Sequence, residues 1–472
     1  MREAYTSSLV KRAQERLATL PLDEAAAAGF IRDRGKYFLN IAYPSMQAMP
    51  EVHQHDVYPA EHMSPDGRDV ALYVHVPFCT AECYYCHYYK EFRQSGDRVD
   101  AYLDGVEVEL AQHRKRLGPI RAQSVYIGGG TPSYLQPSQI ERLFDSIRSN
   151  VSLAEGAEVS FEAHPESTDK ERLATLRANG VNRLNIGIES FEDSLLAAEN
   201  RRHTAQEALS AIALAETFGF KSVNLDLIYG LKDQTVAMWE HTLDVMAGLA
   251  PTSATMYYLR LKQKTPEHSL YKKSPERFPS EKDVLLMHAM NFERMESELG
   301  YIQKPVDWYI RDSSYFHTYQ DHNWRRSDET ELLGVGASAY SYMNGWQYYN
   351  VNHTGRYLEA LAAGNLPIWR GEFLDQEEKM RRTVMLGIKM GMDRAGFQRT
   401  YGIDVVEAFP DEWQSLQDLG LTSITADQVE LTDMGKLLAD EVGQAFYSEP
   451  MRARMEAVDP GLVSTTWPNL NK

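Results

Sequence analysis

The chain has 472 residues, a formal net charge of −18 at pH 7 and three cysteines. This acidic balance argues against a nucleic acid or an anionic membrane as partner, because the phosphates of either would repel the protein. The cysteines are too few for a disulfide framework, and we find no secretory leader and no apolar run long enough for a membrane span, so we expect a cytoplasmic protein.

Residues 1–65 are predicted to form an N-terminal extension. It holds one helix over 7–17, followed by a loop rich in Pro, Met and His. No motif in it indicates a chemical role.

From residue 66 to 345 short β-rich apolar runs alternate with helical patterns. The strands are expected over 71–76, 124–127, 159–163, 183–188, 222–228 and 254–259. The helices are expected over 99–117, 137–150, 170–179, 205–218 and 238–249. Strands alternating with helices indicate a parallel sheet, and six such units predict an α/β fold of the open, partial β/α barrel type.

The last part of the chain, residues 346–472, is predicted to be a mostly helical domain. Its clearest helix covers 376–390, and the sequence at 431–435 is typical of a helix start.

A C-x3-C-x2-C loop follows the first predicted strand and contains Cys79, Cys83 and Cys86. Three thiolates ligate three irons of a [4Fe–4S] cluster and leave the fourth iron open to an external ligand. A zinc site with His87 or His75 as fourth ligand is one alternative, and three cysteines without a joint role is another. A glycine run at 128–130 follows the second strand, and its backbone amides could approach a ligand closely.

Several motifs, taken together, resemble the radical S-adenosylmethionine (SAM) enzymes, and within them the oxygen-independent coproporphyrinogen III oxidase-like branch. The resemblance covers about residues 70 to 345 well and the C-terminal region loosely. The motifs occur in the order of that branch: the segment 73–86 with the three cysteines, Gly-Gly-Gly-Thr-Pro at 128–132, and the segments 161–165, 182–190, 201–204, 224–231 and 334–340.

The resemblance implies a [4Fe–4S] cluster held by Cys79, Cys83 and Cys86, and SAM at its open iron. Reductive cleavage of SAM then yields a 5′-deoxyadenosyl radical, which requires an electron donor such as flavodoxin or ferredoxin. The branch can hold two SAM molecules. By resemblance, the cluster-bound SAM would contact Tyr73, Gly129, Glu162 and Tyr340, and the second SAM would contact Tyr85, Gly130, Thr131, Glu189, Arg201, Asp226 and Leu259. Tyr73 and Glu189 are also the expected catalytic positions.

Departures from the branch guide the choice of function. The further cysteine of the oxidases is absent from His87-Tyr88-Tyr89, and Asn352-His353 does not reproduce the haem-binding element of the haem-trafficking proteins. Glu189 stands where the branch usually has glutamine. We therefore expect an enzyme similar to the class C radical SAM methyltransferases and cyclopropanases.

Such an enzyme would use one SAM as radical source and the other as methylene donor, to methylate or cyclopropanate an sp2 carbon of a small aromatic natural-product intermediate. The tyrosines at 84, 85, 88 and 89 would suit a flat substrate by stacking. The alternative is a coproporphyrinogen III oxidase-like decarboxylase or a haem-handling protein.

Overall fold

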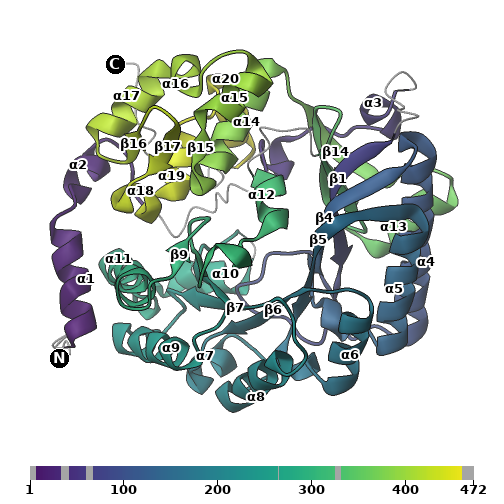
Figure 1. Ribbon diagram of the computed structural model, residues 1–472, viewed down its shortest axis with the longest axis horizontal. Coiled ribbons are helices and arrows are strands. Elements are labelled where there is room, and N and C mark those ends of the chain that lie inside the picture. Colours follow the sequence, from purple (N-terminus) through teal and green to yellow (C-terminus); the bar gives the residue numbers. More distant parts are fainter. Residues whose placement is uncertain (1–6, 33–41, 60–66, 264, 325–330, 460–472) are drawn as a thin grey trace.

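The structure, a computed structural model, describes residues 7–32, 42–59, 67–263, 265–324 and 331–459. Its centre is a twelve-stranded sheet in the order β14-β13-β12-β11-β1-β4-β5-β6-β7-β8-β10-β9. Figure 1 shows this sheet as a curved wall, with helices along its outer side and the C-terminal helices on the opposite side.

All six predicted strands are present and parallel to one another. They are β1 (Arg68–Val76), β4 (Ile120–Gly129), β5 (Val151–Ala163), β6 (Arg183–Glu189), β7 (Ser222–Tyr229) and β8 (Ser253–Tyr258). The connecting helices are α4 (Gly96–Leu117), α5 (Pro137–Asn150), α6 (Lys170–Ala178), α7 (Asp193–Ala198), α8 (Ala205–Glu216) and α9 (Val236–Leu249). A parallel strand that we did not predict, β11 (Glu331–Val335), lies beside β1.

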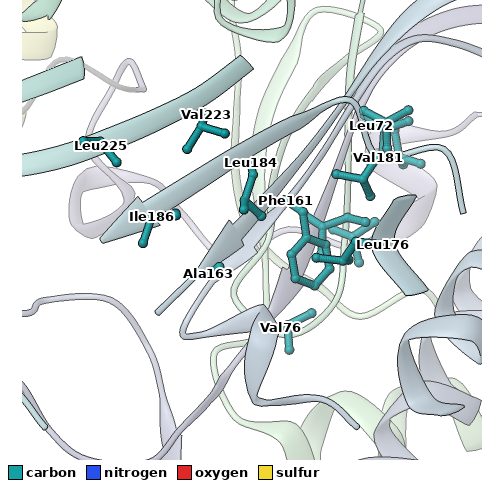
Figure 2. Packing of buried hydrophobic residues seen from close by; sticks show 14 of the residues in the cluster. Leu72, Val76, Phe161, Ala163, Leu176, Val181, Leu184, Ile186, Val223 and Leu225 are labelled. Carbon is teal, nitrogen blue, oxygen red and sulfur yellow. The ribbon is translucent and has the colours of Figure 1, made fainter. Parts of the chain in front are cut away.

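The two faces of this sheet differ in chemistry, because successive side chains of a strand point to opposite sides. One face carries buried apolar residues, among them Phe161 and Ala163 of β5, Leu184 and Ile186 of β6, and Val223 and Leu225 of β7. Figure 2 shows these side chains in one layer with Leu176 of α6. The alternate positions of the same strands carry polar side chains and form the inner face.

Antiparallel strands extend the sheet at both edges. β12 (Tyr340–Met343), β13 (Trp346–Asn350) and β14 (Ile368–Phe373) follow β11, and β10 (Trp308–Ile310) and β9 (Ile302–Gln303) follow β8. The sheet therefore continues past residue 345, where the domain boundary was expected.

The C-terminal domain has an apolar core of its own. Its helical elements are α14 (Gln376–Gly387), η8 (Ile388–Met390), α15 (Arg394–Tyr401), α16 (Val405–Ala408), α17 (Pro410–Asp418), α18 (Asp433–Leu437), α19 (Ala439–Gln444) and α20 (Glu449–Val458). A small antiparallel sheet of β15 (Met392–Asp393), β17 (Gln428–Leu431) and β16 (Thr422–Ile424) accompanies them. The predicted α/β architecture with a mostly parallel sheet and a helical C-terminal domain is confirmed.

The N-terminal extension joins the two large parts of the molecule. Its helix α1 (Ser8–Ala18) packs on α11 (Glu281–Asn291) and the π-helical turn η6 (Phe292–Glu298). Arg16 of α1 donates to Glu293 at 2.6 Å and also to Asp433 of the C-terminal domain. The short elements α2 (Leu22–Ala27), η1 (Met46–Ala48) and α3 (Gln54–Val57) follow.

Three further helices complete the fold: α10 (Pro266–Lys273), α12 (Thr318–Trp324) and α13 (Thr354–Ala362). α12 covers part of the inner face, because its Tyr319 stacks on Tyr126 of β4 with ring centres 4.8 Å apart. Within the described residues, every helix is too short or too polar to cross a bilayer.

Candidate functional site

The three cysteines lie together at the carboxyl end of β1. Cys79 belongs to the two-residue strand β2 (Phe78–Cys79), which pairs with β3 (Glu91–Phe92), and Cys83 and Cys86 lie in the irregular loop between them. All three are free thiols. The pKa of Cys79 is raised to about 12, chiefly by burial and also by the negative charges of Cys86 and Cys83. The three sulfurs therefore lie within electrostatic reach of one another.

This environment fits a cluster bound through thiolates. The hydroxyl of Thr131 donates to Cys79 Sγ, and Nη1 of Arg201 donates to Cys83 Sγ, each at 3.5 Å. Hydrogen bonds and a cation at the sulfurs stabilise the anionic ligands of such a cluster. For the zinc alternative, His75 has both ring nitrogens engaged, with Tyr73 Oη at 2.9 Å and Tyr89 O at 3.3 Å. In the described part of the chain, no three His, Cys, Asp or Glu side chains, the three cysteines included, are placed to hold a single ion.

The glycine run packs directly against the cysteine loop. Gly130 N donates to Val76 O and Thr131 N to Phe78 O, both at 2.8 Å. A Cβ at Gly129, whose φ is +116°, would lie 2.6 Å from the ring of His75, and a Cβ at Gly130 would lie 2.9 Å from the backbone of the segment 76–78. The glycines are therefore required for contact between two chain segments, and the amides of Gly130 and Thr131 already bond to the protein.

Three carboxylates occupy the inner face beside this loop. Glu162 accepts a hydrogen bond from Tyr126 Oη at 2.6 Å and another from Gly129 N at 3.1 Å. Asp226 accepts one from Asn224 Nδ2 at 2.8 Å. Burial raises the pKa of Asp226 to about 8, with further contributions from the charges of Glu189 and Glu162. The site thus concentrates carboxyl groups in a poorly hydrated place.

Arg201 connects the carboxylates to the cysteine loop. Its Nη1 lies 3.5 Å from Glu189 Oε1 and donates to Cys83 Sγ, while its Nη2 donates to Gly187 O. Burial raises the pKa of Glu189, and the cation of Arg201 and a hydrogen bond from Tyr85 oppose this shift. Glu189 has φ +67°, a conformation that a side chain other than glycine adopts at a cost, and such strain is often found at functional sites.

Aromatic rings continue the site on the side of β1. The rings of Tyr73 and Tyr340 have centres 5.2 Å apart, and Tyr340 Oη accepts a hydrogen bond from Asn323 Nδ2 at 3.1 Å. Tyr85 packs against a separate apolar cluster that contains Leu259. The predicted site residues therefore come from six strands and the following loops but form one connected group at a single end of the sheet.

The four tyrosines of the cysteine loop do not form a joint stacking surface. Tyr85 faces Glu189, and Tyr88 lies within electrostatic reach of Glu162 and Asp226. Tyr84 instead lies over the ammonium of a lysine, and Tyr89 donates to Glu91 at 2.6 Å. The expectation that all four suit a flat substrate is not met by this arrangement.

Some residues of the site were missed from the sequence. Tyr126 and Asn224 bind the carboxylates directly, Thr255 accepts a hydrogen bond from Asn224 at 3.0 Å, and Tyr257 lies near Asp226. Each of these residues lies on the inner face together with a predicted site residue. It is either an even number of positions away from that residue on the same strand, or opposite it on the neighbouring strand. Polar residues alternating with apolar ones in these strands were the available signal.

The chain matches two family descriptions, Radical SAM superfamily over residues 73–246 and HemN C-terminal domain over residues 374–438. It is 30% identical over 382 residues to the heme chaperone HemW of Bacillus subtilis, which covers 80% of this chain and 99% of that protein. It is 28% identical over 399 residues to the oxygen-independent coproporphyrinogen III oxidase of Salmonella typhimurium, covering 80% and 85%. The solved structure of coproporphyrinogen III oxidase (HemN) from Escherichia coli superposes with a TM-score of 0.74 at 25% identity, covering 86% of this chain and 96% of that one.

These relatives correct the expected function. We expected a methyltransferase or cyclopropanase of a natural-product pathway, and that expectation is wrong, because the proteins that match this chain over most of their length are named as haem chaperones and coproporphyrinogen III oxidases. The departures at His87-Tyr88-Tyr89 and Asn352-His353 do not separate this chain from those proteins. The expected superfamily and branch are confirmed: the cysteine loop and the similarity over 80% of the chain agree that it belongs to the radical SAM superfamily, in the branch of the HemN and HemW proteins.

Proposed function

We propose that the chain acts on a tetrapyrrole and is an oxidative decarboxylase of the coproporphyrinogen type. The observation that carries the proposal is the group of Glu162, Glu189 and Asp226 beside the cysteine loop, bordered by tyrosines, in a chain that aligns with most of the length of oxidases so named. The printed activity of those relatives supplies the reaction class.

The chemistry of this group suits a porphyrinogen. The four pyrrole N–H groups at the centre of the macrocycle are donors, and buried carboxyl groups are acceptors for them. Tyrosine rings such as Tyr73 and Tyr340 offer apolar faces to the pyrrole rings. With its pKa raised to about 8, Asp226 is mostly neutral at pH 7, which lowers the repulsion between the site and the propionates of the substrate.

The family implies a [4Fe–4S] cluster and SAM, and Cys79, Cys83 and Cys86 would hold the cluster. When bound, the two groups supply a 5′-deoxyadenosyl radical that takes a hydrogen atom from the substrate. In the proposal, Tyr73, Glu162, Gly129 and Tyr340 bind the cluster-bound SAM.

A second SAM site is also part of the proposal. Its residues would be the remaining members of the predicted set, namely Tyr85, Gly130, Thr131, Glu189, Arg201, Asp226 and Leu259. Glu189 and Tyr73 lie at the reacting positions. The number of SAM molecules bound per chain, measured by equilibrium dialysis of the reconstituted protein, tests this part.

An electron donor such as flavodoxin or ferredoxin would approach from the outer side of the cysteine loop. Two adjoining hollows of about 390 and 430 Å³ lie there and share Thr80, Tyr134 and Glu166. Thr80 directly follows Cys79 in the sequence. Both hollows therefore lead from solvent to the chain segment that carries a cluster ligand.

The test is anaerobic turnover of the reconstituted protein with coproporphyrinogen III, SAM and a reductant. We expect protoporphyrinogen, carbon dioxide and 5′-deoxyadenosine, without S-adenosylhomocysteine. Glu162→Gln removes one charged acceptor at the cluster-bound SAM, so it should weaken SAM binding by about ten-fold and lower the yield of carbon dioxide with it. Thr80→Ala, outside the carboxylate group, is the control. Absence of carbon dioxide from an enzyme that still cleaves SAM would refute the decarboxylase.

A second candidate is haem binding, favoured by the 30% identity to a heme chaperone over 99% of its length. Under this proposal the same carboxylates and tyrosines would contact the haem edge. Titration of the protein with haem, followed by its optical spectrum, should then give saturable binding that competes with coproporphyrinogen III. Turnover without stable haem binding favours the oxidase, and stable binding without turnover favours the chaperone.

A further inference from the structure

The turn between Cys83 and Cys86 is held from two sides at Tyr84. Tyr84 N donates to Glu199 O at 3.3 Å, and Tyr84 O accepts from Glu267 N at 3.4 Å. Glu199 ends α7 and Glu267 lies in the first turn of α10. The loop has no regular secondary structure here, so these two bonds join it to segments that lie far away in the sequence.

The side chains of the same two glutamates meet on Lys232. The ammonium Nζ of Lys232 donates to Glu267 Oε1 and lies 3.6 Å from Glu199 Oε1. It also lies 5.1 Å from the centre of the Tyr84 ring, within the range of a cation–π contact. The exposed fractions of the three side chains are 7% for Lys232, 2% for Glu199 and 1% for Glu267. We call these three residues the lysine clamp.

The lysine clamp joins these segments at a cost in free energy. It buries two carboxyl groups and one ammonium, and burial of ions costs free energy that a pair regains only in part. The pKa of Glu199 is raised to about 8, chiefly by burial and also by the charge of Glu267, while Lys232 opposes the shift. An apolar contact of equal size would stabilise the fold as well or better. The arrangement therefore points to a role at the loop that it contacts.

A neighbouring contact holds the chain directly before Cys83. Asn200, directly after Glu199, donates from Nδ2 to Glu82 O at 2.6 Å. The segment 199–200 thus binds the chain on both sides of Cys83, at Glu82 and at Tyr84. Lys232, two residues after Gly230 at the end of β7, connects this segment to the parallel sheet.

We propose that Lys232 is a positioning residue for the iron–sulfur loop: held by Glu199 and Glu267, it fixes Tyr84 and thereby the separation of Cys83 and Cys86. Its ammonium also places a buried positive charge below the turn. The inference goes beyond the proposed function, because it concerns the cluster that the whole family carries and not the substrate.

The chain offers a matched control in Lys389 of the C-terminal domain. Its side chain is also 7% exposed, its ammonium donates to Asp440, and it lies 5.3 Å from the centre of the Trp324 ring. Lys232→Met and Lys389→Met therefore remove the same kind of group, a buried lysine paired with a carboxylate and an aromatic ring. Only the first is in contact with the cysteine loop.

The experiment compares the two variants in three measurements. In the apoprotein, hydrogen exchange of the peptide containing residues 83–86 should become about ten-fold faster in Lys232→Met and stay unchanged in Lys389→Met. In the reconstituted protein, a chelator should remove iron about ten-fold faster from Lys232→Met, and the EPR spectrum of the reduced cluster should change there alone. Lys232→Arg keeps the cation, so its hydrogen exchange, rate of iron loss and EPR spectrum should match those of the unchanged protein.

The outcome that overturns the proposal is equal behaviour of the two methionine variants in exchange, iron loss and EPR spectrum. Should Lys232→Met fail to fold, Lys232→Gln provides the same comparison, because it is uncharged but keeps hydrogen-bonding atoms. None of these readouts uses a tetrapyrrole, so failure of the proposed function leaves the test intact, and failure of this test leaves the proposed function intact.

Discussion

The strand-end site and the contact between barrel and C-terminal domain both bury charged side chains, but they balance charge differently. At the strand ends, Glu162, Glu189 and Asp226 lie within electrostatic reach of one another, and Glu189 pairs with the cation of Arg201. At the domain contact, two cations meet two carboxylates. Arg260 Nε lies 3.1 Å from Asp440 Oδ2, its Nη2 lies 3.1 Å from Glu441 Oε1, and Lys389 also donates to Asp440.

The pKa shifts follow this difference. Burial works to raise the pKa of Asp440, yet Lys389 and Arg260 hold it below its usual value. Burial raises the pKa of Asp226, and there the neighbouring carboxylates add to the shift. Paired charges thus hold two domains together, whereas the excess negative charge at the strand ends is maintained against the stability of the fold. Perturbed groups of that second kind are frequent at functional sites.

The largest effect should come from the cysteines, on which the strand-end site depends. Cys79→Ala, Cys83→Ala or Cys86→Ala should abolish bound iron and SAM cleavage, because each removes one of three ligands. Iron and sulfide analysis after anaerobic reconstitution measures the loss, with Thr80→Ala as a control in the same loop. A variant that keeps about four irons per chain would contradict the assignment of these cysteines as ligands.

Removing Arg260 from the ion pairs at the domain contact should strongly lower the free energy of unfolding. Arg260→Met leaves Glu441 and part of the charge of Asp440 buried without their partner, which costs about 3–5 kcal/mol. Urea unfolding of the apoprotein gives the change in free energy of unfolding. The exposed Arg399, 3.7 Å from Asp393, is the comparison, and its replacement by Met should change that free energy by less than about 1 kcal/mol.

Asp226→Asn should instead act on the pH dependence of stability. The pKa of Asp226 rises from 3.8 to about 8 on folding, so between these values the folded chain holds a proton that the unfolded chain releases. The free energy of unfolding therefore falls as the pH rises through this window and levels off above about pH 8. Asp226→Asn should remove this component of the slope in urea unfolding series.

Glu199 contributes to the slope in the same direction, but it is present both in the unchanged chain and in Asp226→Asn. The difference between their two slopes therefore isolates Asp226. A slope identical in the two proteins would mean that Asp226 is ionised in the folded chain at neutral pH. The negative charge at the strand ends would then be larger than we infer.

The smallest effect is expected for Glu189→Gln. Glutamine bears the same backbone cost at φ +67°, and its amide oxygen still faces Arg201, so the free energy of unfolding should change by less than about 1 kcal/mol. SAM affinity, measured by calorimetry on the reconstituted protein, should change less than about ten-fold. A complete loss of SAM binding would assign this carboxylate a larger role than we propose.

The sequence by itself determined the strand and helix units and the cysteine loop. β4, β6 and α5 occur where apolar periodicity and the glycine and asparagine stops predicted them, because these signals are local. The short spacing of Cys79, Cys83 and Cys86 likewise indicates that their thiols share one loop, and their joint role as cluster ligands stays a prediction. The choice of function could not be predicted, because relatives with different names share these motifs.

The tertiary structure alone decided which distant segments meet. β11 pairs with β1 across more than 250 residues, and Lys232, Glu199 and Glu267 meet below Tyr84 from three separate segments. Strand partners and side-chain neighbours depend on register and on how the sheet curves, and no local pattern encodes either. For the same reason the excess of carboxylates at the strand ends, and the balance of charges at Arg260, became evident only once the strands and the C-terminal domain were in place.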